Sequence, residues 1–143
     1  MHADRPQAPG YLANQMARLF HEVSGEGLEP LGIRPEHFPI LVELWFSPAD
    51  VTQATLEQSQ EADAATVDAW LGAMASDGLI EAISGDRTEK LVLTPKAIAA
   101  RDDAIKAARR ANQAATDALS EAEMAQFIDM MNRVIEALQA AKA

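Results

Sequence analysis

The stretch TVDAWLGAMASDGLIEA, residues 66–82, decides the fold. Its large apolar side chains recur at helical spacing on one face, and they are Val67, Trp70, Leu71 and Met74. Asp63 precedes them as an N-cap, and Gly78 follows where helices commonly end in a left-handed residue. The pattern predicts a helix over 64–77 that runs into a strand over 79–83.

The helix predicted over 64–77 contains no Lys or Arg, and it carries Asp68 and Asp77. Cations are missing from a wider block, because residues 35–86 hold ten acidic side chains and no basic one. Residues 1–34 carry a charge of −1 and residues 87–143 a charge of +1, so this block accounts for the net charge of −10. Two interpretations stay open: a helix that reads a polyanion despite an acidic face, or a packed helix that serves the fold or another protein.

The chain ahead of this block predicts an arm and a helix. Residues 1–10 hold two prolines and few apolar groups, which favours a flexible N-terminal arm. A 3.6-residue stripe then predicts a helix from residue 11 to about residue 23, formed by Leu12, Met16, Leu19, Phe20 and Val23. We expect Gly25 and Gly27 to weaken or end this helix.

Two further helices precede the quoted stretch. Pro35 suits the first turn of a helix whose inward face is predicted to be Phe38, Leu41, Val42, Trp45 and Phe46. Residues 47–50 break it, and residues 51–52 suit either a very short strand or the start of a helix. A short helix over 53–59 follows, with Leu56 inward.

A hairpin and two long helices follow the quoted stretch. Residues 84–86 predict a turn between strands at 79–83 and 91–93. Thr94 as N-cap and Pro95 at the first helical position begin an Ala-rich helix that reaches about residue 119.

The last helix begins with a capping-box pattern at Ser120 and Glu123. Its apolar seam repeats at coiled-coil spacing and consists of Met124, Ile128, Met131, Ile135 and Leu138. The seam fits either a pairing of helices within the chain or a dimer interface. We favour a dimer arm built from the first, fifth and sixth helices, because one small domain leaves their stripes largely bare.

This order predicts a mainly α fold: a winged helix-turn-helix with a small β-hairpin wing and a long-helix dimerisation arm. The predicted regions are a flexible arm over 1–10, a helical dimerisation region over 11–34 and 95–143, and the winged unit over 35–94.

Three segments in this order resemble the MarR family of dimeric winged-helix transcriptional regulators. They are LGIRPEHFPILVEL at 31–44, ATVDAWLGAMASDGLIE at 65–81 and GDRTEKLVLTPKA at 85–97. The likeness covers about residues 12–138. Family members typically carry several Arg or Lys along the recognition helix, whereas this chain has Ala69, Ala73, Asp77 and Ala82 at such places. This chain therefore keeps the apolar positions that pack the family's fold, but it lacks many of the family's basic residues.

The resemblance implies double-stranded DNA and a second copy of the chain as partners. We expect DNA contacts from Thr66 and Asp68 on the recognition helix, Arg87 and Lys90 on the wing, and Lys96. Asp68 can accept from a cytosine amino group, and helix N–H groups near Thr66 can contact a phosphate. The residues expected at the dimer interface are Leu12, Met124, Phe127, Ile128, Met131, Ile135 and Leu138.

A small aromatic effector is also implied by the resemblance. Residues that could border its cleft are Met16, Phe20, His37, Trp45 and Trp70, although apolar side chains in such positions are more often core. The chain has no Cys, and its histidines are far apart, so we expect no metal site and no cofactor. No nucleophile motif or nucleotide-binding glycine loop is visible, so we expect no enzyme.

The sequence leads to two hypotheses. The first is a MarR-like dimeric transcriptional regulator, cytoplasmic and without a membrane segment, that binds DNA weakly or atypically because its reading helix is acidic. The alternative is an interaction protein on the same scaffold that binds a basic protein partner instead of DNA.

Overall fold

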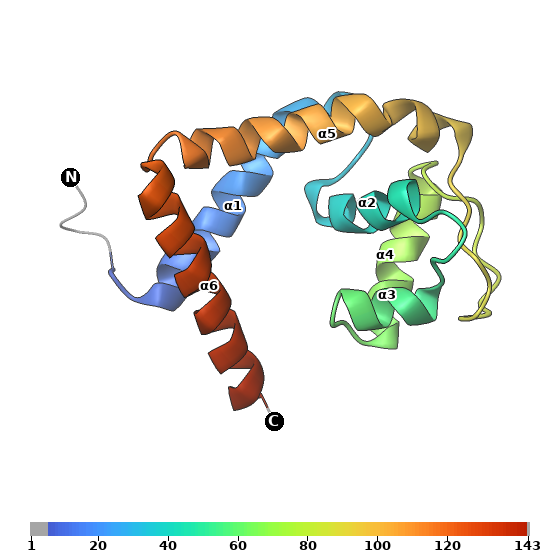
Figure 1. Cartoon of the computed structure of the whole chain (residues 1–143). Helices are drawn as coiled ribbons and strands as arrows, with labels where there is room; N and C mark the ends of the chain where they lie inside the picture. The colour runs from blue at the N-terminus through green and yellow to red at the C-terminus, as the bar shows by residue number, and fades with distance from the viewer. Residues whose placement is uncertain (1–5, 143) are drawn as a thin grey trace.

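The computed structural model describes residues 6–142, and these residues are mainly helical (Figure 1). The α-helices are α1 Pro9–Leu28, α2 Phe38–Phe46, α3 Gln53–Ser59, α4 Ala64–Ser76, α5 Pro95–Thr116 and α6 Glu121–Ala141. Short 3-10 helices, η1 Glu29–Leu31 and η2 Pro35–His37, join α1 to α2. The mainly α class predicted from the sequence is confirmed.

The predicted helix boundaries at α4, α5 and α6 agree with the structure to within a few residues. Asp63, Thr94 and Ser120 each accept a hydrogen bond from the backbone N–H three residues on, as N-caps do. Glu123 completes the capping box of α6, with its carboxylate 2.9 Å from the Ser120 nitrogen. Gly78 has φ +75°, the left-handed conformation expected after α4.

The prediction that α1 weakens or ends at its glycines was wrong, because the helix continues to Leu28. The reason is close packing of α1 on α5. A Cβ built on Gly27 would lie 2.6 Å from the Cβ of Ala107, so only glycine fits there. The helix also starts earlier than expected: Pro9 and Gly10, assigned from the sequence to a flexible arm over 1–10, form its first turn. Residues 1–5 of that arm lie outside the described residues.

One core joins the helices of the winged unit to the start of α5. Its buried residues include Leu41 and Leu44 of α2, Leu56 of α3 and Val67 of α4. The predicted inward face of α2 was partly wrong: Phe46 is 62% exposed, and Ile40 and Leu44, which were not predicted to face inward, are buried. The buried positions on α2 are Ile40, Leu41, Leu44 and Trp45, and Phe46 is about 100° further round the helix than Trp45.

The predicted β-hairpin is not present as a regular hairpin in residues 6–142. Two isolated antiparallel bridges occur instead, Thr52 with Lys90 and Ile80 with Leu93. Segment 90–93 is shared between two neighbours, since it pairs at one end with the residue before α3 and at the other with the residues after α4. Each neighbour therefore receives a single bridge, which is too short for a ladder. Thr52 fulfils both predictions made for 51–52: it pairs in a bridge and is the N-cap of α3.

The long helices form an arm that meets the winged unit at two places (Figure 1). The start of α5 belongs to the shared core, and Gln139 Nε2 near the end of α6 donates to the Glu61 carboxylate at 3.0 Å. Helix α5 leaves the winged unit, packs along α1, and turns into α6, which folds back. Helix α6 has no buried residue, and only Met124, Phe127 and Met131 are half-buried. A single copy of the chain therefore leaves most of the apolar seam of α6 in water.

Candidate nucleic-acid interface

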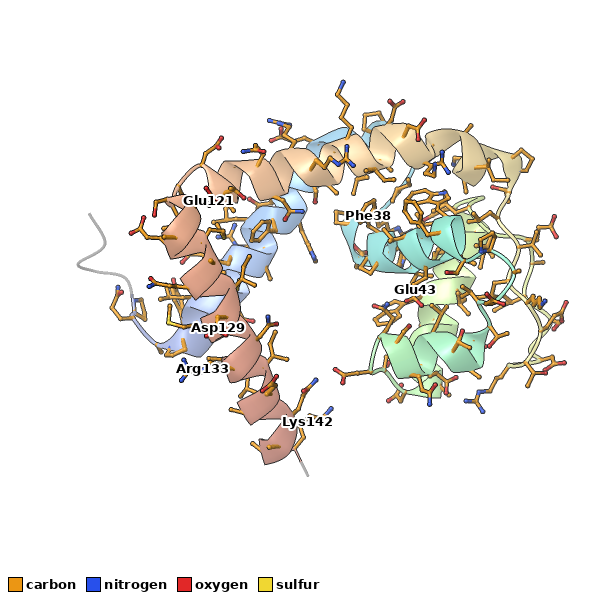
Figure 2. All side chains as sticks on the ribbon, in the orientation of Figure 1. Phe38, Glu43, Glu121, Asp129, Arg133 and Lys142 are labelled. Atoms are coloured by element: carbon orange, nitrogen blue, oxygen red, sulfur yellow. The ribbon has the colours of Figure 1, made fainter. Side chains whose placement is uncertain are left out.

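The two helices of the helix-turn-helix are fixed by side-chain caps and by α2. Thr52 and Thr55 form a reciprocal capping box at the start of α3. The Glu43 carboxylate, labelled on α2 in Figure 2, accepts hydrogen bonds from Ser59 Oγ at 2.7 Å and Gln60 Nε2 at 2.6 Å. These two hydrogen bonds hold the end of α3 against α2, and so they set the angle between α3 and the following helix α4.

Helix α4 buries one face and presents the other to solvent. Val67, Leu71 and Met74 are buried, and Trp70 is half-buried. Apart from Ala64 at its first position, the exposed positions of α4 carry only small or acidic side chains: Ala65, Thr66, Asp68, Ala69, Gly72 and Ser76. We call these six residues the α4 outer face. Nothing on this face is long enough to keep a neighbouring macromolecule away from the helix backbone.

The N-terminus of α4 is already occupied by an acidic cap. Asp63 Oδ1 accepts the Thr66 N–H at 2.8 Å. Hydrogen bonds from Thr66 hold the pKa of Asp63 below its ordinary value, so the carboxylate is charged at neutral pH. Of the N–H groups at the start of α4 that were predicted to contact a phosphate, the Thr66 N–H therefore has an intramolecular partner, and that partner is an anion.

The segment between the two predicted wing strands, residues 84–90, contacts α3 through Arg87. Its guanidinium pairs with both carboxylate oxygens of Glu57, and the Nε to Oε2 distance is 2.9 Å. The Arg87 carbonyl also accepts the Ala54 N–H at 3.1 Å. The Glu57 pair raises the pKa of Arg87 above its ordinary value, so the guanidinium stays charged. The most prominent cation of the wing is thus partly neutralised within the chain.

Of the two lysines predicted to contact DNA, Lys96 lies at the opposite end of α4 from Thr66. Lys96 Nζ donates to the carbonyl of Asp77 at 2.9 Å, at the C-terminal end of α4. That end is about 16 Å along the helix axis from Thr66, by the rise of an α-helix. Lys90 is exposed beside an apolar groove that also contains Trp45. The structure brings Thr66 and Asp68 together on the α4 outer face, but it places the three cations at separate positions around it.

The intramolecular partners of these groups were not predicted from the sequence. Asp77, one of the two acidic residues of the helix predicted over 64–77, is paired with Arg34 at 3.1 Å. Glu57 and Glu43 were also not singled out. Their partners lie 16 to 43 residues away in sequence, and no local spacing reveals contacts of that kind.

The five residues proposed to border an effector cleft are distributed over several sites. Met16 and Phe20 line a shallow apolar cavity of about 240 Å³ between α1 and α5. Trp45 lines a different cavity, between α2 and α5. His37 is buried at the start of α2, and Trp70 is half-buried on α4. The effector site predicted from these residues stays a prediction.

Within residues 6–142, no three His, Asp or Glu side chains lie together in a way that could hold a metal ion. No helix in the same range is long and apolar enough to cross a membrane.

Comparison with known proteins identifies the fold. No family model and no curated protein matches the sequence. Solved structures do match, at 17 to 24% sequence identity for the eight compared here. A MarR transcriptional regulator from Methanosarcina mazei is 18% identical with a TM-score of 0.74, over 92% of this chain and 94% of that one.

Three of the similar structures contain DNA, and two of them are described here. MepR from S. aureus bound to DNA is 19% identical with a TM-score of 0.81, covering 92% of this chain and 99% of that chain. A MarR family protein from Mycobacterium tuberculosis in complex with DNA is also 19% identical, with a TM-score of 0.62 over 90% and 98%. The chain therefore has the fold of the MarR-family transcriptional regulators, and the resemblance seen in the sequence is confirmed for the fold. The similar structures are regulators rather than enzymes.

Proposed function

We propose that this chain, which has the fold of the MarR-family regulators, is a dimeric transcriptional regulator that binds duplex DNA through the α4 outer face. The observation that carries the proposal is the construction of α4. The helix is held from behind by Val67, Leu71 and Met74 and is bare of large side chains in front. A helix held in this way fits the major groove, which is about 12 Å wide.

The α4 outer face suits direct contact with base edges. Small side chains allow the helix backbone to approach the groove floor, where Ala and Thr methyl groups can contact thymine methyls. Thr66 also offers a hydroxyl, and Asp68 can accept a hydrogen bond from a cytosine amino group. Recognition would therefore depend on shape and methyl contacts more than on arginine–guanine pairs.

Phosphate binding by this face is weak for physical reasons. Affinity for DNA comes largely from Lys and Arg that displace counterions from phosphates. Arg87 shares its charge with Glu57, and Asp63 places an anion at the α4 N-terminus. We therefore expect specific complexes that form at low salt and little binding to duplexes of unrelated sequence.

The apolar surface of the arm supports a dimer. Large apolar side chains of α1 and α6 are between a third and two thirds exposed, and they are Tyr11, Met16, Leu19, Ile128, Met130, Val134, Ile135 and Leu138. Exposed apolar patches of this extent commonly mark protein interfaces. A second copy that covers them would also pair two α4 helices, as a palindromic operator requires.

One alternative is favoured by a specific observation. Acidic side chains of the chain occupy the groups that a phosphate would otherwise use, with Glu57 on Arg87 and Asp63 on the Thr66 N–H. A winged face built in this way suits a basic protein partner. On this alternative the same surface would capture a cationic protein and no duplex.

Selection from a random duplex pool at ~50 mM salt separates the two functions. We expect the full-length protein to enrich a palindromic sequence, and Ala69→Glu to abolish the enrichment by adding a long anion to the α4 outer face. Ala122→Glu, at an exposed position on α6, is the matched control and should bind as the parent does. No enrichment by the parent protein, with capture of a basic protein instead, would establish the alternative.

A further inference from the structure

An apolar groove lies between α2, the wing root and the start of α5, apart from the α4 outer face. Its volume is about 530 Å³, within the range of about 300–1,000 Å³ found for small-molecule sites. Its walls consist of Leu44, Trp45, Pro48, Lys90, Leu91, Val92, Leu93, Ile98 and Arg101. We call these nine residues the wing-root groove.

Among its lining residues, the interior of the wing-root groove offers no free polar side-chain group. Trp45 is its only aromatic side chain, and the Trp45 Nε1–H donates to the carbonyl of Ala97 at 3.0 Å. The remaining interior side chains are aliphatic. Two of them, Val92 at 49% and Ile98 at 61%, are more exposed than large aliphatic side chains usually are. A ligand with a hydroxyl group in its body would lose that group's hydrogen bonds to water without replacement.

The only polar side chains that line the groove are two cations, Lys90 and Arg101. Two neighbouring cations are unusual on this chain, because its net charge is −10 and its residues 35–86 contain no Lys or Arg. Among the described residues, Arg101 pairs with its neighbour Asp102, whose side chain is 87% exposed and 3.2 Å away. No ion pair involves Lys90 within residues 6–142. An apolar floor with positive charge as its only polar feature complements an anion carried on an apolar body.

We propose that the wing-root groove binds an aliphatic carboxylate, such as a free medium-chain fatty acid. The acyl chain would lie on Trp45, Val92 and Ile98, and the carboxylate would pair with Lys90 and Arg101. The site goes beyond the proposed DNA-binding function and does not depend on it. Since its walls come from α2, segment 90–93 and α5, an occupant would brace the root of the wing against the long helix.

The test is a titration of the full-length, DNA-free protein with decanoate, kept below its micelle concentration. Binding is followed by calorimetry and by Trp45 fluorescence in a Trp70→Phe background. We expect saturable 1:1 binding that Lys90→Gln and Arg101→Gln each weaken by roughly fivefold, the scale of one exposed charge pair. Arg109→Gln, at another exposed arginine of α5, is the matched control and should leave the affinity unchanged.

Ligands of different chemistry complete the test. Decanol should bind at least about fivefold more weakly than decanoate, because it lacks the charge. A hydroxybenzoate should bind more weakly still, because its hydroxyl finds no partner in the groove. The proposal is overturned if decanoate does not saturate, if Arg109→Gln weakens binding as much as Arg101→Gln, or if hydroxybenzoate binds as tightly as decanoate. It is also overturned if the protein binds anionic lipid vesicles but not free decanoate.

Discussion

The guanidinium of Arg87 on the wing pairs with both carboxylate oxygens of Glu57 on α3. Glu57 is the better buried partner, with a side chain 16% exposed against 53% for Arg87. The pair therefore holds the wing on the helix-turn-helix, and it also holds a cation away from any phosphate. A single carboxylate thus stabilises the winged unit and, under the proposed function, limits its affinity for DNA.

The first prediction concerns this pair. Glu57→Gln keeps a hydrogen-bonding side chain but removes the charge, so Arg87 becomes available to a phosphate. We expect affinity for the selected duplex to rise roughly five- to tenfold at low salt. The measurement is fluorescence anisotropy, with Asp103→Asn on α5 as a control of equal charge change. Equal gains in the two variants would show that net charge, rather than release of Arg87, is responsible.

The second prediction concerns pH. His37 is buried, and desolvation lowers its pKa below 6.5, although the nearby Glu36 opposes this shift. As the pH falls below 6.5, the unfolded chain takes up this proton before the folded chain does, so the free energy of unfolding decreases. The stabilisation is complete above pH 6.5 and is lost as the pH falls through the lowered pKa.

Denaturant unfolding at pH 7.5 and pH 5, values about a unit either side of the ordinary histidine pKa, tests this. His37→Gln should lose less stability over that interval than the parent protein. His21→Gln, at an exposed histidine of α1, should lose as much as the parent. If the free energy of unfolding changed equally with pH in all three proteins, His37 would not be the source of the pH dependence.

The third prediction concerns the contact between α1 and α5. Gly27→Ala should destabilise the protein by about 1–3 kcal/mol through overpacking against Ala107, less the ~1 kcal/mol that alanine gains over glycine in a helix. The double variant Gly27→Ala/Ala107→Gly should recover part of the loss. Gly10→Ala meets nothing within 4 Å and should not destabilise the protein. Thermal unfolding measures the stability of all three variants. If Gly27→Ala left the melting temperature unchanged, α1 and α5 could separate freely.

The fourth prediction concerns the dimer. Ile135 and Leu138 on α6 are 50% and 63% exposed in one copy, so Ile135→Asp/Leu138→Asp should not disturb the fold of a subunit. We expect the dimer dissociation constant to rise at least ~100-fold, because each side chain loses its apolar burial twice. Analytical ultracentrifugation measures this, with Gln126→Asp on another face of α6 as control. An unchanged sedimentation coefficient would remove α6 from the interface.

Features with local causes could be predicted from the sequence. The caps at Asp63, Thr94 and Ser120 depend on residues three positions apart, and the reversal at Gly78 depends on one backbone angle. The course of α1 could not be predicted in the same way. Glycine usually weakens a helix, and only the position of Ala107, 80 residues away, explains why Gly27 lies inside one.

The candidate interface was predicted in its outline but not in its electrostatics. The block without cations is visible in the sequence, and Thr66 and Asp68 do lie on an exposed face. The pairing of Arg87 with Glu57 and the placement of Lys96 at the far end of α4 depend on tertiary contacts. The prediction of a β-hairpin wing was wrong for a related reason. Segment 90–93 forms one bridge with Thr52 and one with Ile80, so it forms no regular hairpin with residues 79–83.

The most direct test of the central claim is the salt dependence of binding to the selected duplex between ~50 and ~200 mM salt. Full use of Arg87, Lys90 and Lys96 in both subunits would give a log–log slope of about −5. Since Arg87 is paired and Lys96 lies at the far end of α4, we expect a specific complex with a slope of about −2. A protein that retains no duplex even at ~50 mM salt, or a tight complex with a slope near zero, would contradict the proposed function.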